Sequence, residues 1–204
     1  MVCQGCYRIT SRAILCDDCR ARLRPAPDRL LAGGIRVIAA FEHTGPARTL
    51  SHHLKYRGIV SYAELVAAVL AEKVPRVPLV PLPRARSRWA KYGIDPAEIL
   101  ARSLAKRIDV PVYRLLRPPI HAPRRAGGDH DRPVDVPGLR KRTLEKVLVV
   151  DDVLTTGATL EAAVSVLGAS HVRAAVVANA VPAISGQLRG SRWDAPRQAR
   201  NEEL

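Results

Sequence analysis

Two adjacent aspartates followed by three threonines and a glycine form the segment with the clearest capacity for chemistry. The segment reads Val150-Asp151-Asp152-Val153-Leu154-Thr155-Thr156-Gly157-Ala158-Thr159. An aliphatic strand pattern precedes it and a helix pattern follows it. Its residues are therefore expected at the carboxyl end of a buried strand, where open α/β sheets bind ligands.

The hydroxyl-rich half of this segment suits a phosphate group. The start of a helix presents unpaired N–H groups and the positive end of the helix dipole. Gly157 allows the backbone to approach a phosphate closely, and the threonine hydroxyls can donate to its oxygens. Asp151 and Asp152 repel a phosphate but suit sugar hydroxyls. The spacing predicts a ligand with a phosphate at one end and vicinal hydroxyls nearby, as in ribose 5-phosphate.

Helix capping alone is a weaker interpretation of these residues. A cap would explain one threonine but not the paired aspartates after a buried strand. The chain contains no Gly-x-x-x-x-Gly-Lys-Ser/Thr run, which disfavours a P-loop nucleotide site.

All four cysteines lie close to the N-terminus, as two Cys-x-x-Cys pairs: Cys3, Cys6, Cys16 and Cys19. Four thiolates with this spacing suit a tetrahedral, structural Zn²⁺. Two disulfides are disfavoured if the compartment is reducing. A redox pair is disfavoured because both pairs precede any βαβ pattern. The cysteines therefore predict a small zinc module.

A second group of residues carries positive charge and one aromatic ring. A loop is expected after the strand that ends at residue 82, and it contains Arg84, Arg86, Arg88, Trp89 and Lys91. These side chains suit a diphosphate or a nucleic acid, and an aromatic ring among basic residues is typical of single-strand binding. A solvated basic surface, with Trp89 packed against the sheet edge, is the alternative.

Composition limits the class of protein. The 204 residues fit one ordinary domain with a small addition, and 47% hydrophobic against 4% aromatic residues predicts an aliphatic core. A net charge of +14 attracts polyanions. The base composition of the source genome would also produce an arginine-rich chain, so the charge alone does not identify a partner. The sequence shows neither an apolar run of membrane-spanning length nor a signal-peptide pattern. We expect a cytoplasmic protein without membrane insertion.

Hydrophobic periodicity predicts an α/β protein in which strands alternate with helices. Strands are expected at 36–42, 77–82, 146–150 and 172–181, with a short one at 112–116. Helices are expected at 46–57, where Gly58 ends the helix, and from a capping box at Ser61. Further helices are expected at 96–108, with Asp95 as the cap and one apolar face, and at 160–167. The neighbouring residues His52 and His53 diverge on a helix, so with His43 they are expected to be ordinary surface or core side chains rather than metal ligands.

We expect three parts in the chain. Residues 1–34 form the zinc module and a linker rich in proline and glycine, residues 35–189 form the main domain, and residues 190–204 form a polar tail. A long loop is expected at 117–142, where prolines, glycines and charges gather.

These motifs together resemble the ComF family of competence-associated proteins, within the type I phosphoribosyltransferases. The resemblance rests on the Asp-Asp and Thr-Thr-Gly-Ala-Thr segment, on the cysteine pairs, on Lys55-Tyr56-Arg57-Gly58 and on Val80-Pro81-Leu82-Pro83-Arg84. It extends in order from residue 3 to about residue 182.

The resemblance implies a twisted, mostly parallel sheet flanked by helices, with an N-terminal zinc module. It implies that Asp151 and Asp152, as the catalytic pair, hold the ribose hydroxyls of phosphoribosyl diphosphate or a related ribose phosphate. Residues 155–159, which are Thr155, Thr156, Gly157, Ala158 and Thr159, would hold the 5-phosphate. Arg84 and its loop would face the diphosphate, which binds with Mg²⁺.

Two segments depart from the family pattern: residues 91–96 and residues 121–128. Both are expected on the acceptor or partner side of the site. Two hypotheses follow. One is a Mg²⁺-dependent enzyme that transfers a phosphoribosyl group to an acceptor. The other is a non-catalytic protein that binds single-stranded DNA and works with DNA-uptake or recombination proteins.

Overall fold

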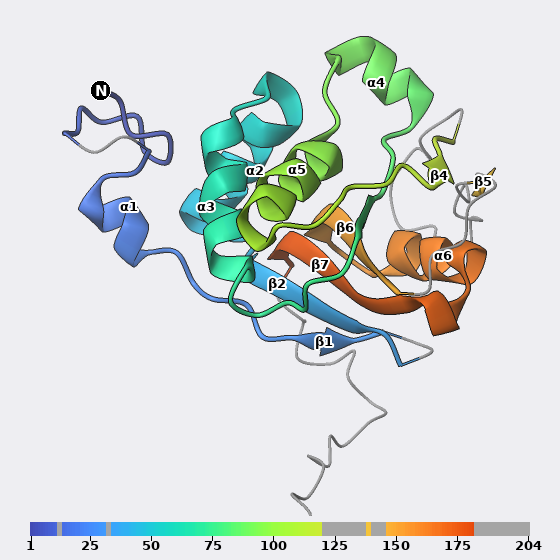
Figure 1. Ribbon diagram of the computed structural model, residues 1–204. Coiled ribbons are helices and arrows are strands. Elements are labelled where there is room, and N and C mark those ends of the chain that lie inside the picture. Colours follow the sequence, from blue (N-terminus) through green and yellow to red (C-terminus); the bar gives the residue numbers. More distant parts are fainter. Residues whose placement is uncertain (12–13, 32–33, 120–137, 140–145, 182–204) are drawn as a thin grey trace, which may run out of the picture.

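The computed structural model describes residues 1–11, 14–31, 34–119, 138–139 and 146–181. A five-stranded sheet lies at its centre, in the order β1-β2-β7-β6-β3 (Figure 1). Strands β2 (Arg36–Glu42), β7 (Val172–Ala180), β6 (Val147–Leu154) and β3 (Leu79–Pro81) run parallel, and β1 (Arg29–Leu30) pairs antiparallel with β2. The predicted mostly parallel α/β fold is confirmed.

Helices cover both faces of this sheet. Helices α2 (Gly45–Arg57), α3 (Val60–Leu70) and α5 (Pro96–Ile108) lie on one face, and α6 (Ala158–Leu167) lies on the other (Figure 1). Alternate residues of β2 supply the two cores: Ile38 and Ala40 pack with the first group, Val37 and Ala39 with α6. Burial on both faces explains why the strands are continuous aliphatic runs.

Strand β6 is longer than the aliphatic run predicted. It continues through Asp151 and Asp152 to Leu154, and Asp151 pairs with Val177 of β7. Both aspartates therefore belong to the carboxyl-terminal half of a central strand and do not follow it. The pairing on the β7 side fixes their backbone, so the two carboxylates project from a rigid element.

Two helix boundaries agree with the predicted signals. Helix α2 ends at Gly58, which has a φ of 65°, a left-handed conformation that glycine adopts without steric cost. Helix α5 begins after Asp95, whose side chain accepts a hydrogen bond from the Glu98 N–H. The predicted apolar face of α5 is buried throughout.

Three local predictions are wrong. Ser61 does not cap α3, since that helix begins one residue earlier with Ile59 at the cap position. The expected basic loop contains a helix, α4 (Arg86–Tyr92). The short strand expected at 112–116 is only a single bridge between Val112 and Leu79, and the next strand, β4 (Leu116–Arg117), pairs with β5 (Gly138–Leu139).

The segment predicted as a linker is partly ordered against the sheet. It contains β1, and the Ala26 N–H donates to the Ala40 carbonyl of β2.

Two short helical elements complete the described structure. Helix α1 (Asp17–Ala21) belongs to the cysteine-rich region, and a short 3₁₀ turn (Ala169–His171) precedes β7. Most of the expected 117–142 loop and all of the 190–204 tail lie outside the described residues. Among the helices described, none is long and apolar enough to cross a membrane.

Candidate functional site

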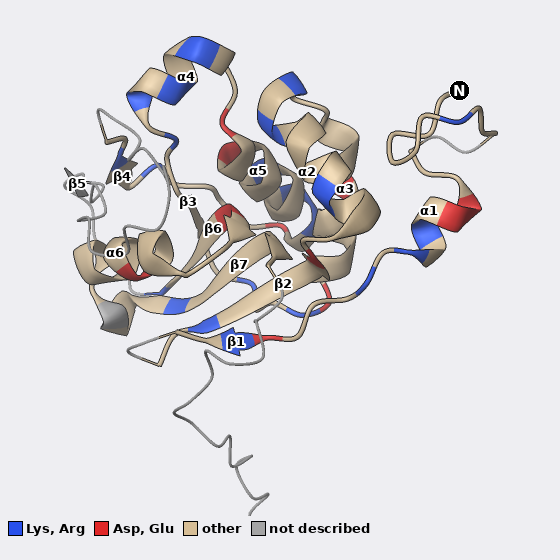
Figure 2. Cartoon of the chain, turned by 180° about the vertical axis from the view of Figure 1, so that it is seen from behind, with Lys and Arg blue, Asp and Glu red and all other residues tan. Residues whose placement is uncertain are grey.

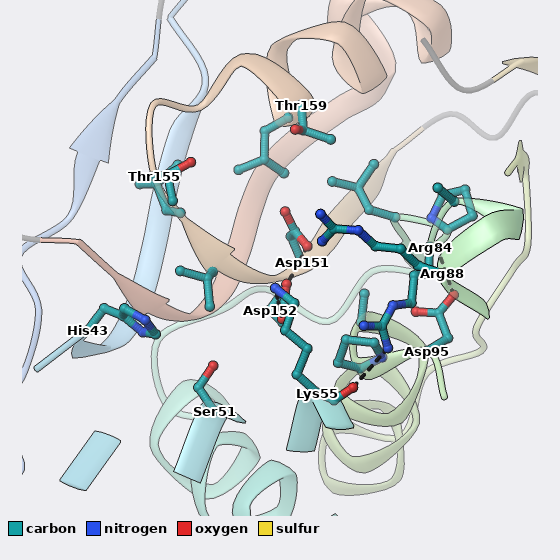
Figure 3. Close-up of a pocket in the computed structure, with 18 of the residues that line it drawn as sticks. His43, Ser51, Lys55, Arg84, Arg88, Asp95, Asp151, Asp152, Thr155 and Thr159 are labelled. Carbon is teal, nitrogen blue, oxygen red and sulfur yellow. Dashed lines mark hydrogen bonds and ion pairs between the residues drawn. The ribbon is translucent and has the colours of Figure 1, made fainter. Parts of the chain in front are cut away.

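A cavity of about 360 Å³ lies at the carboxyl end of the parallel strands. The ends of β2 and β6, the turn after β6, helix α2 and the segment after β3 surround it (Figure 3). Its polar lining comprises His43, Ser51, His52, Lys55, Tyr56, Arg84, Arg88, Asp95, Asp151, Asp152, Thr155 and Thr159. Strands far apart in the sequence therefore bring the predicted aspartates, threonines and arginines to one place.

Asp151 and Asp152 form the floor of this cavity. Asp152 is 8% exposed, and its Oδ2 lies 3.1 Å from Nζ of Lys55 at the end of α2. The Asp152 N–H donates to Oδ1 of Asp151 at 2.7 Å. Burial, and then the charge of Asp152, raise the pKa of Asp151 well above its ordinary value. The site therefore holds one ion-paired carboxylate beside one that resists ionisation.

The turn between β6 and α6 presents the predicted phosphate-binding groups. Gly157 has a φ of 93°, a left-handed conformation that favours glycine. A Cβ at this position would lie 2.6 Å from Cδ2 of Leu31, so there is no room for a larger residue without a shift of Leu31. Thr155, Gly157 and Thr159 line the cavity, whereas Thr156 is exposed and its hydroxyl accepts from the Ala158 N–H at 3.4 Å. The first turn of α6 follows directly, with its N–H groups at the cavity edge.

Arg84 lies at the cavity but holds the protein's own backbone. Its Nη1 donates to the carbonyls of Lys55 and Ile94, at 2.8 and 2.9 Å, and its backbone N–H donates to Asp95. Its guanidinium also lies 4.8 Å from the ring centre of Tyr92. Burial lowers the pKa of Arg84. Arg84 therefore links the end of α2 to the segment before α5, and its buried Nη2 has no hydrogen-bond partner among the described residues.

The remaining basic residues divide into two groups. Arg88 reaches the cavity from α4 (Figure 3). Arg86, Trp89 and Lys91 do not line the cavity and lie on the exposed surface of α4, whose basic residues are visible in Figure 2. Trp89 is 57% exposed, so the alternative that it packs against the sheet edge is wrong.

Several residues of the cavity were not singled out from the sequence. The sequence predicts no role in the site for Lys55 and only a helix cap at Asp95. His43 was expected to be an ordinary histidine, yet it lines the cavity and contacts a buried polar pair. That pair is Asn179 of β7 and Tyr62 of α3. The available signal was Asn179, a polar residue that follows five consecutive aliphatic residues of β7.

The four cysteines converge away from this cavity. Their sulfurs all lie within 4.8 Å of one another, and Sγ of Cys6 is 3.7 Å from Sγ of Cys16. Tetrahedral Zn–S bonds of about 2.3 Å place sulfurs about 3.8 Å apart, so the cluster fits such an ion. A Cβ at Gly5 would lie 3.0 Å from Sγ of Cys19, which explains the glycine inside the first pair.

A polar contact joins the cysteine-rich region to the main core. The Tyr7 hydroxyl lies 2.8 Å from Nε2 of His53, a buried residue of α2, and the two rings are in contact. Cys3 and Cys19 are themselves buried in the core on the α2 side of the sheet. The cluster thus packs on the helix that carries Lys55.

The fold and the cavity define an α/β protein with a site suited to a sugar phosphate. A model of the phosphoribosyl transferase domain matches residues 90–198, more than half of the chain, and the chain belongs to this family. The matched segment contains α5, β6, the threonine turn and β7. The expectation of a phosphoribosyltransferase fold is therefore confirmed.

The solved structures similar to this chain include an orotate phosphoribosyltransferase from Aeropyrum pernix. It shares 22% identity over 78% of this chain and 75% of its own, with a TM-score of 0.35. A comparison with curated proteins gave no match.

Proposed function

We propose that this chain is a ComF-type protein that binds phosphoribosyl diphosphate with Mg²⁺ and transfers the phosphoribosyl group to an acceptor. One observation carries the proposal: Asp151 and Asp152 line the same cavity as Thr155, Gly157 and Thr159. A carboxylate pair beside a helix-start phosphate turn matches the two ends of a ribose 5-phosphate.

Each part of the ligand has a partner in this arrangement. The 5-phosphate lies on the turn, where the N–H groups of α6 and the hydroxyls of Thr155 and Thr159 donate to it. The ribose hydroxyls donate to the carboxylates of Asp151 and Asp152. The diphosphate faces Arg88, whose guanidinium suits phosphate oxygens and is not engaged in a described ion pair.

Magnesium fits the donors present, because the carboxylates offer the hard oxygen ligands that this ion prefers. Asp151 and Asp152 would hold it, largely through water, beside the diphosphate. When bound, Mg²⁺ neutralises part of the charge on the leaving group.

The reaction joins the acceptor to carbon 1 of the ribose. A lone pair of the acceptor forms the new bond as the bond from carbon 1 to the diphosphate oxygen breaks, and the electron pair leaves with the diphosphate. The aspartates orient the ribose, and Arg88 stabilises the departing oxygens. The proton on the acceptor atom passes to solvent.

The division of the chain into parts belongs to this proposal as well. Residues 1–34 would form a module organised by one structural Zn²⁺ on Cys3, Cys6, Cys16 and Cys19. Residues 35–189 would form the phosphoribosyltransferase domain, and residues 190–204 a tail.

A second function has its own supporting observation, the exposed basic face of α4. Trp89 is 57% exposed between Arg88 and Lys91, and the net charge of the chain is +14. An exposed ring among basic side chains suits single-stranded DNA, which a non-catalytic ComF-type protein would bind during DNA uptake. Affinity for a single-stranded oligonucleotide should then fall steeply from low to moderate salt, and Trp89→Ala should weaken it. A salt-independent affinity would exclude this function.

Thermal unfolding with ligand fragments tests the first proposal. A ligand that binds only the native state raises the melting temperature, and at equal concentration a tighter ligand raises it more. With Mg²⁺ present, phosphoribosyl diphosphate should stabilise the protein more than ribose 5-phosphate or diphosphate alone at equal concentration. Equal effects of diphosphate and the full ligand would mean that the aspartates and the turn contribute nothing.

A further inference from the structure

His43 lines the cavity on the side away from Arg84 and Arg88. It follows β2, and its backbone N–H donates to the Ala180 carbonyl at 2.7 Å, which fixes it at the end of β7. Figure 3 shows His43 across Asp151 and Asp152 from Arg84 and Arg88. The acceptor and the leaving diphosphate must lie on opposite faces of carbon 1 during displacement. If the diphosphate faces the arginines, His43 lies on the acceptor side.

A buried amide fixes which nitrogen of His43 carries the proton. Asn179 is 0% exposed, and its Nδ2 donates to the carbonyl of Ala47 at 3.0 Å. A carbonyl only accepts, so the amide cannot be reversed, and its Oδ1 accepts from the hydroxyl of Tyr62. The second hydrogen on Nδ2 points to Nδ1 of His43, 3.1 Å away. Nδ1 is therefore an acceptor, and the neutral ring carries its proton on Nε2.

The neutral form of the ring is favoured by its surroundings. Burial, followed by the nearby charge of Arg48, lowers the pKa of His43. Asp152 opposes this effect and Lys55 and His52 add to it. At neutral pH the ring therefore offers a donor at Nε2 and no free lone pair, and it cannot serve as a general base.

The buried polar pair links β7 to α2 and α3 and also contacts His43. Tyr62 and Asn179 are fully buried among aliphatic residues, and apolar residues of similar size would fill the same space without the need for polar partners. Their joint effect is to hold one imidazole in one tautomer at the cavity wall.

We propose that His43 is a specificity-determining residue that donates from Nε2–H to a lone pair of the second substrate, with Asn179 and Tyr62 as positioning residues. This inference rests on the proposed phosphoribosyl transfer. It narrows the acceptor to a molecule with a carbonyl, carboxylate or unprotonated ring nitrogen beside its nucleophilic atom. A cationic amine at that position would face a donor and is excluded.

Nitrogen NMR of the histidines tests the proposal without knowledge of the acceptor. The six histidines are labelled with ¹⁵N, and two-bond correlations to the ring carbon protons report each tautomer. His43→Phe assigns the His43 signals. His52→Phe is the matched control, since His52 also lines the cavity but lies outside the amide network. We expect His43 in the neutral form protonated at Nε2, and Asn179→Asp should move the proton to Nδ1.

Acetate, a minimal oxygen acceptor, is then titrated into protein saturated with Mg²⁺ and phosphoribosyl diphosphate. The Nε2 resonance of His43 should shift with acetate and not with methylammonium at equal ionic strength. A His43 ring protonated at Nδ1, or an Nε2 resonance that does not shift with acetate, would overturn the proposal. A response present in free protein but lost with the diphosphate ligand would also overturn it, since His43 would then belong to the phosphoribosyl site. If the proposed phosphoribosyl transfer itself is wrong, the wild-type protein will not bind phosphoribosyl diphosphate, and that result is distinct from those above.

Discussion

Lys55 and Asp152 form an ion pair across the cavity, with Nζ 3.1 Å from Oδ2. The pair connects the last turn of α2 to the central strand β6, and both side chains are largely buried. Burial, and then the charge of Asp152, raise the pKa of the neighbouring Asp151. The unequal state of the two carboxylates is a property of the ligand-free site.

This inequality predicts the effect of pH on stability. A carboxyl group with a raised folded pKa binds more protons in the folded than in the unfolded state. Its contribution to the free energy of unfolding therefore falls as pH rises from the ordinary value of 3.8 through the raised one. Asp151→Asn retains an acceptor for the Asp152 N–H and removes the titration. Urea denaturation should show the variant gaining stability over wild type as pH rises from 3.8 to about 8. A constant difference across that range would contradict the account.

The two arginines at the cavity should separate stability from ligand affinity. Arg84→Lys loses the guanidinium that links two carbonyls, so the free energy of unfolding should fall by about 1–3 kcal/mol. Arg88→Gln, at an exposed position, should change stability by less than about 0.5 kcal/mol and weaken phosphoribosyl diphosphate binding about tenfold. Calorimetry and urea denaturation of both variants provide the comparison. If Arg84→Lys lowered affinity alone, the linking role of Arg84 would be wrong.

Gly157, in the turn after β6, should be less replaceable than Gly93, which follows α4. At Gly157 an alanine would meet both a left-handed backbone and the side chain of Leu31. At Gly93, where φ is 64°, an alanine would meet the left-handed backbone alone, because no atom lies within 4 Å of its Cβ. Strain costs about 1–2 kcal/mol in both, and crowding adds about 1 kcal/mol or more at Gly157 alone. The double variant Gly157→Ala with Leu31→Ala should recover the crowding part relative to Leu31→Ala. Equal losses in the two single variants would show that Leu31 does not crowd the turn.

The cysteine cluster should hold one metal ion and stabilise the main core. Metal analysis is expected to give about one zinc per chain, and chelation should lower the melting temperature. Tyr7→Phe leaves the cysteines intact but removes the partner of buried His53, which should cost about 1–2 kcal/mol. Zinc content should stay unchanged in that variant. A metal-free protein with the same melting temperature would contradict the assignment.

Local signals predicted the elements whose boundaries depend on nearby residues. The 36–42 strand, the end of α2 at Gly58 and the start of α5 at Asp95 follow from aliphatic runs, a glycine stop and a capping side chain. Helix α4 could not be found in this way, because none of its residues is buried and it has no apolar face. The prediction of a cap at Ser61 was wrong because α3 begins at Val60, directly after α2 ends at Arg57 and Gly58, so the start of α3 needs no separate capping side chain.

The candidate site was predicted in part, for a similar reason. The aspartates and the threonine turn are contiguous in sequence, so their chemistry could be read directly. Lys55, His43 and Asn179 reach the site only through the parallel pairing of β2, β7 and β6 and the packing of α2. No local pattern encodes that proximity. The role of Arg84 was also hidden, since it depends on the carbonyls of Lys55 and Ile94.

Isothermal titration of the wild-type protein with phosphoribosyl diphosphate, with and without Mg²⁺, tests the central claim most directly. The matched variant is Asp151→Asn with Asp152→Asn, whose folding is checked by its unfolding transition. We expect saturable, Mg²⁺-dependent binding to the wild type and a loss of affinity of about tenfold or more in the variant. Absence of binding to the wild type, or unchanged affinity in the folded variant, would contradict the assignment of the ribose site.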